Sequence, residues 1–90
     1  MKWDKKLHKF GMVKLTSTHY CTFKYEGVEE LSNTNFIVSC SCTTPTYNPD
    51  TKELKVGLYM GEIGQKNASI SIKKDGVIMD ILGLQATIIQ

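Results

Sequence analysis

The residues of this chain best suited to metal binding or nucleophilic chemistry are three cysteines and two histidines: Cys21, Cys40, Cys42, His8 and His19. Structural zinc sites take four ligands arranged in spaced pairs. Only these five residues could supply such ligands, so a soft-metal site is the less favoured interpretation. We expect no metal and no other cofactor.

The cysteines are odd in number, so they cannot all form disulfides within one chain. Buried or half-buried free thiols are favoured, and a disulfide involving Cys21 is the alternative. A bridge between Cys40 and Cys42 is not expected, because the Cα atoms of residues i and i+2 on an extended strand lie near the upper limit of disulfide reach.

His19 and Cys21 form the only pair that could act as base and nucleophile. Two residues apart on a strand, their side chains point in parallel, which suits packing, and no third orienting group is evident. The acids fall in expected turns or strand ends, where solvated charge is the usual role: Glu26, Glu29, Glu30, Glu53 and Glu62. The sequence therefore predicts no catalytic residues, and we do not expect an enzyme.

Charge argues against a nucleic-acid partner. The chain has a net charge of +2, and all eleven of its basic residues are lysines. Phosphate and guanine recognition rely heavily on the planar guanidinium of arginine, which is absent. No apolar run approaches the length needed to span a membrane, and no apolar segment follows the basic start Met1–Lys6. We therefore expect no membrane partner and a chain folded in a cytoplasm.

Apolar and polar residues alternate with the two-residue period of β structure through most of the chain. The chain has only 90 residues and contains no repeat, which predicts one domain over residues 1–90. Strands are expected around residues 10–13, 18–25, 36–42, 54–60, 68–73 and 77–88. These elements predict an all-β fold, a small antiparallel β-sandwich of about seven strands, with a small barrel as the alternative.

Two glycine positions and one change of phase are informative within these strands. Gly11 predicts a bulge or bend in the first strand. Asp75-Gly76 is a strong signal for a two-residue hairpin turn. The last strand begins with Val77, Met79 and Ile81 in one phase and continues from Leu82 in the other, so a bulge near 81–83 is expected to restore the inward face.

The order of these features resembles an Ig-like domain family of unknown function found in bacteria and phages, related to the Hydin-type Ig-like domains. The residues that carry the resemblance span nearly the whole chain: Phe10–Val13, Phe23–Tyr25, Ser39–Pro45 with its CxCT motif, Leu54–Val56 and Asp75-Gly76. The family's usual CGC is CSC here. The resemblance implies an Ig-like sandwich that serves as an interaction or spacer module.

From this resemblance we expect a structural accessory protein of a tailed-phage virion, assembled in the host cytoplasm. Its expected role is capsid decoration, with other virion proteins as partners and the major capsid protein first among them. A bacterial Ig-like interaction module of the cell envelope is the alternative. A small thiol-dependent enzyme or metal carrier is a third class. Homo-oligomerisation stays open.

Aromatic residues expected outside the core are the candidate contact residues of such a module, because aromatics are enriched at protein interfaces. They are Trp3, Phe10, Tyr20, Tyr47 and Tyr59. A small sandwich also exposes single aromatics without any functional reason, so the alternative is that these residues bind nothing.

Overall fold

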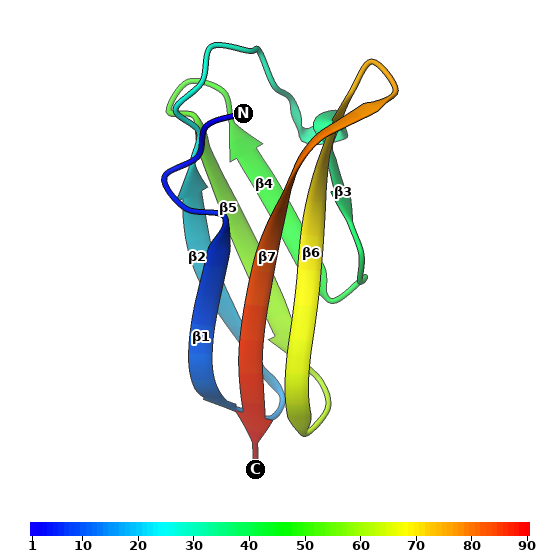
Figure 1. Cartoon of the computed structure of the whole chain (residues 1–90). Helices are drawn as coiled ribbons and strands as arrows, with labels where there is room; N and C mark the ends of the chain where they lie inside the picture. Colours follow the sequence, from blue (N-terminus) through cyan, green and yellow to red (C-terminus); the bar gives the residue numbers. More distant parts are fainter.

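The computed structural model describes every residue from Met1 to Gln90 and contains two separate β-sheets (Figure 1). Strands β1, β7, β6 and β3 form one sheet in that order, and β2, β5 and β4 form the other. The strand bounds are β1 Leu7–Lys14, β2 Ser17–Lys24, β3 Phe36–Val38, β4 Thr43–Asn48, β5 Glu53–Met60, β6 Gly64–Lys74 and β7 Val77–Ile89. One 3-10 turn, η1, covers Asn33–Asn35. The expected all-β sandwich of seven strands is confirmed, and the barrel alternative is wrong.

The strand order is that of an Ig-like sandwich. The second, fifth and fourth strands make one sheet, and the third, sixth and seventh make the other, as in strands B-E-D and C-F-G of that fold. Strand β1 belongs to the sheet of β7, β6 and β3, where it pairs in parallel with β7. Earlier in the chain, before β1, Trp3 forms an isolated antiparallel bridge with Tyr25, the residue that follows β2, in the other sheet.

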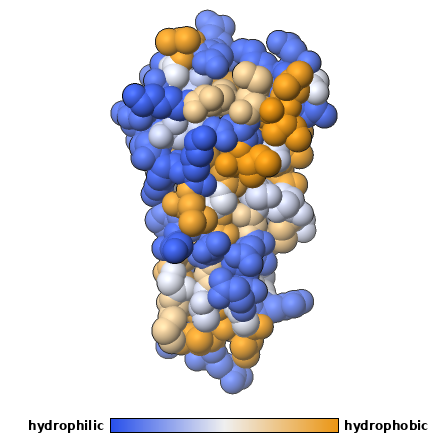
Figure 2. All heavy atoms as spheres, in the orientation of Figure 1, coloured by the Kyte–Doolittle hydropathy of each residue, from blue (hydrophilic) through white to orange (hydrophobic).

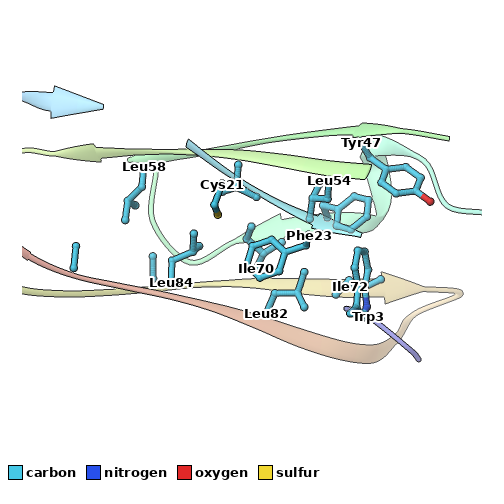
Figure 3. Close-up of a cluster of buried hydrophobic side chains, with 14 of the residues drawn as sticks. Trp3, Cys21, Phe23, Tyr47, Leu54, Leu58, Ile70, Ile72, Leu82 and Leu84 are labelled. Carbon is cyan, nitrogen blue, oxygen red and sulfur yellow. The ribbon is translucent and has the colours of Figure 1, made fainter. Parts of the chain in front are cut away.

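The core lies between the two sheets and consists of the inward-facing set of each strand (Figure 3). From β2 and β5 come Phe23, Leu54 and Leu58, and from β6 and β7 come Ile70 and Leu82, all fully buried. Burying a side chain of this size stabilises a fold by about 1.5–3 kcal/mol. The alternation seen in the sequence therefore has its expected physical cause.

Two of the predicted backbone features are confirmed. Gly11 has a φ of +75°, and the β1–β7 register shifts between Lys9 and Met12, which is a bulge. Asp75 and Gly76 have φ values of +53° and +78°, as a tight hairpin turn between β6 and β7 requires.

The last strand does contain a bulge, as predicted, but the predicted position near 81–83 is wrong. The register of the β6–β7 pair shifts nearer the hairpin tip, because Ile72 pairs with Asp80 but Lys73 pairs with Ile78, which leaves Met79 as the extra residue. The tip projects at the upper right of the sandwich (Figure 1). Its apolar side chains are exposed, so the first phase of the strand does not turn into the core: Val77, Ile78, Met79 and Ile81.

The predicted continuation of the third strand through Cys42 is also wrong. Strand β3 ends at Val38, and the Thr43 N–H donates to the Cys40 carbonyl at 3.1 Å, which closes a turn. This turn brings the Cα atoms of Cys40 and Cys42 to 5.2 Å, and a disulfide joins the two residues. The prediction of no such bridge fails because the chain is bent here, not extended. Cys21 is a free, buried thiol, so the alternative of a Cys21 disulfide is wrong as well.

Candidate functional site

Two of the five predicted contact residues belong to the core. Trp3 is 6% exposed and Tyr47 is 4% exposed, so both were wrongly predicted to lie outside it. The bridge between Trp3 and Tyr25 directs the indole between the sheets, where its ring lies 5.0 Å from the Tyr25 ring. The Tyr47 ring lies 5.2 Å from that of Phe36. Figure 3 labels Trp3 and Tyr47 among the buried side chains.

Phe10 is half-buried at the side of the sandwich where β1 and β2 approach. Its ring centroid lies 4.6 Å from that of His8 and 6.0 Å from that of His19. It packs against the core and so closes this side of the molecule. Phe10 is therefore a half-buried packing residue.

Tyr20 and Tyr59 are exposed, at 61% and 45%, and the fold brings them together on the outer face of the β2-β5-β4 sheet. Tyr20 pairs with Gly57 across the two strands, and Thr18 pairs with Tyr59. The two tyrosines therefore occupy diagonal positions on one face. Between them lies an open groove of about 520 Å³, here called the tyrosine groove. Its remaining lining comes from Thr18, Ser41, Cys42, Thr44 and Gly57.

Gly57 forms the floor of the tyrosine groove. A Cβ atom at this position would lie 2.8 Å from Cε1 of Tyr20, so the Tyr20 ring can rest on the strand only because residue 57 has no side chain. Lys55 Nζ lies 5.0 Å from the centroid of the same ring, within cation–π range. Sequence reasoning missed Gly57, although a glycine inside a strand is a signal of close approach by another group.

The disulfide-bonded turn forms one wall of the tyrosine groove. Ser41 and Cys42 line the groove, and the Tyr59 N–H donates to the Cys42 carbonyl at 2.9 Å, which ties the turn to β5. A second hollow of about 350 Å³ adjoins the groove, shares Cys42 and Tyr59 with it, and runs toward the Gly61–Lys66 segment. Cys42 and Tyr59 therefore border both hollows.

The groups in the tyrosine groove are phenols, hydroxyls and backbone. They can stack, exclude water and exchange hydrogen bonds, which are the interactions of protein recognition. The chain contains no group of three or more His, Cys, Asp or Glu side chains placed to hold a metal ion.

Of the possible base and nucleophile, His19 is half-buried and Cys21 is buried in the core. Burial raises the pKa of the Cys21 thiol to about 11, partly offset by the charge of Lys5. Burial and the nearby Lys5 ammonium lower the pKa of His8. A thiol with so high a pKa carries little thiolate near neutral pH.

The Cys21 pKa predicts a loss of stability in alkali. The unfolded chain releases this proton near pH 9 and the folded protein keeps it to about pH 11, so stability is complete below about pH 9 and falls as pH rises between these values. Urea unfolding midpoints measured across this window should decrease. Cys21→Ala is the control and should flatten the decrease between about pH 9 and 10. Above that Tyr25, whose pKa burial raises to about 12, contributes the same decrease to both proteins. Equal pH dependence of the two proteins would contradict the assignment.

A second exposed feature lies on the other sheet. Ile37, Ser71 and Ile81 form one row across β3, β6 and β7, and the exposed tip of the β6–β7 hairpin extends it. Figure 2 shows apolar atoms gathered at the upper right of the molecule, where this hairpin lies. None of the three hollows of the structure lies on this apolar patch, which distinguishes the patch from the tyrosine groove.

No helix of this structure has the length and apolar character needed to cross a membrane. Comparisons of the chain with protein-family models, with curated proteins and with solved structures found no significant match.

Proposed function

We propose that this chain is a binding domain that acts by adhesion, and that its role is that of a structural accessory protein of a tailed-phage virion. In this proposal the tyrosine groove docks on other virion proteins, with the major capsid protein as the first candidate. The observation that carries it is the placement of two exposed tyrosines, Tyr20 and Tyr59, around one groove on the outer face of the β2-β5-β4 sheet. The virion role itself draws on the resemblance of the sequence to the phage and bacterial Ig-like family.

The chemistry of the tyrosine groove suits adhesion. Tyrosine gives a large contact area with only two side-chain torsions to fix, so its ordering on binding costs little entropy. Hydrogen bonds between strands and the tie from Tyr59 to Cys42 hold the groove in shape before a partner arrives. A modest interface repeated over a symmetric lattice would hold firmly through avidity.

The Cys40–Cys42 disulfide is compatible both with the virion role and with the alternative role, an interaction module of the bacterial cell envelope. Disulfides persist in oxidising surroundings such as the periplasm, cell surfaces and virion surfaces, and are rare in reducing cytoplasm. The bridge therefore favours a working location outside the cytoplasm. A particle released from its host and a cell envelope both meet that condition.

Intact particles separate the two roles. Mass spectrometry of purified virions from the phage that carries this gene should find the chain at a copy number comparable to that of the major capsid protein. Detection in infected-cell extract but not in particles would count against the virion role. Recovery in the envelope fraction of a bacterial host would favour the alternative.

Tyr59→Ala should weaken docking on particles that lack the protein by at least about tenfold, because a central interface aromatic typically contributes 2 kcal/mol or more. Its exposure means that folding stability should change little. Co-sedimentation of the purified variant with such particles measures the effect. Ile81→Ala is the matched control, since it removes an exposed apolar side chain from the opposite sheet. If Ile81→Ala weakens docking and Tyr59→Ala does not, the apolar patch is the binding surface and the groove is not.

A further inference from the structure

Strand β2 presents an unpaired edge. It pairs only with β5, and the Tyr25 N–H donates to the Lys52 carbonyl, so the odd-numbered residues direct their backbone groups toward β5. The even-numbered residues direct theirs away from the sheet. At Lys24 this outward position is occupied by Asp4, whose N–H donates to the Lys24 carbonyl and whose carboxylate accepts from the Lys24 N–H, both at 2.9 Å. The outward groups of Thr18, Tyr20 and Thr22 have no partner.

The other edges are protected in ways that natural sheets use against unwanted pairing. On β4, Pro45 has no N–H, and the Asn33 side chain bonds both backbone groups of Tyr47. Strand β3 has only three residues, and β1 carries the bulge at Gly11. The end of β6 that extends past β3 offers only two outward positions, at Gln65 and Asn67. The edge of β2 is regular and contains no Lys, Arg, Asp or Glu from Ser17 to Phe23.

The sequence of this edge is self-complementary. Tyr20 is flanked at equal distance by Thr18 and Thr22. When two such strands pair antiparallel around a two-fold axis at Tyr20, each Thr18 faces a Thr22 of the other copy, and the two Tyr20 residues face each other. Threonine pairs are favourable across strands. All three pairs use the outward backbone groups, so each pair exchanges two hydrogen bonds.

We propose that β2 pairs antiparallel with β2 of a second copy of this chain. The two three-stranded sheets then become one continuous six-stranded sheet with closed two-fold symmetry. Because Tyr20 lines the tyrosine groove, the grooves of the two copies meet at the axis and form one longer concave surface. The inference goes beyond the proposed function and does not depend on it, because the test uses the purified chain alone.

Sedimentation velocity over a wide concentration range, up to millimolar, should show a reversible equilibrium between monomer and dimer. Thr22→Lys should weaken the dimer by about tenfold or more, since edge lysines oppose strand pairing. Thr46→Lys is a closely matched control. Thr22 and Thr46 flank the same residue, Lys55, on opposite sides of β5, so both variants place the same new charge beside the same lysine. Only the first variant touches the β2 edge, and the second should dimerise normally.

Amide hydrogen exchange locates the interface. The N–H groups of Thr18, Tyr20 and Thr22 should exchange freely in dilute protein and become protected as the dimer forms. A monomer at every concentration would overturn the proposal, whether or not the edge accepts a strand from another protein. Equal weakening by both lysine variants would overturn it, as would protection confined to the β6–β7 hairpin.

Discussion

Trp3→Ala is expected to lower the free energy of unfolding by about 3–5 kcal/mol, the usual cost of truncating a buried aromatic side chain. The indole is 6% exposed and packs 5.0 Å from the Tyr25 ring and 6.3 Å from the Phe36 ring, measured between centroids. Tyr25 directly follows β2, and Phe36 begins β3. Trp3 therefore connects the two sheets at one end of the sandwich, and its loss leaves a cavity there.

For a domain of this size, each kcal/mol shifts the melting temperature by about 4–8 °C, so the variant should melt at least about 12 °C lower. Differential scanning calorimetry measures the shift. Tyr20→Ala is the control, because it truncates an aromatic ring that is 61% exposed and should change stability by about 0.5 kcal/mol or less. Similar losses for both variants would mean that Trp3 is not a core residue.

The strand pattern was predictable because each long strand has one face in the core. In β2 and β5 the buried and exposed residues alternate as the sequence indicated, so Tyr20 and Tyr59 were correctly placed outside. When one face of a strand is buried, apolar residues recur at every second position, so the sequence itself shows which side chains point into the core. The Asp75-Gly76 turn was predictable for a similar reason, since its positive φ values depend on local residue types.

Features that depend on contacts between distant segments were not predictable in this way. Trp3 is buried because its backbone bridges Tyr25, a pairing that no local pattern records. The end of the third strand was missed for a different reason: the alternation continues through Cys42 in the sequence, yet the chain turns after Val38, and a local hydrogen bond from the Thr43 N–H to the Cys40 carbonyl closes the turn. Gly57 became part of the site only through the β2–β5 register that sets Tyr20 opposite it.

Leu82 and Ile81 test the register of β7, where the sequence prediction failed. Leu82 is fully buried and Ile81 is 52% exposed, although they are neighbours of similar size on the same strand. Leu82→Ala should therefore cost about 2–5 kcal/mol of unfolding free energy. Ile81→Ala removes a comparable side chain from the solvent side and should cost about 0.5 kcal/mol or less. Urea unfolding of the two variants against the unaltered chain measures both values.

The comparison also decides where the β7 bulge lies. With the extra residue at Met79, the strand is regular from Asp80 onward, so only the even-numbered side chains reach the core. A bulge over 81–83 would instead turn Ile81 inward together with Leu82, and both substitutions would then cost several kcal/mol. A much larger loss of unfolding free energy for Leu82→Ala than for Ile81→Ala therefore supports the bulge at Met79 and an exposed hairpin tip. Equal large losses would show that Ile81 is buried and that the bulge lies elsewhere.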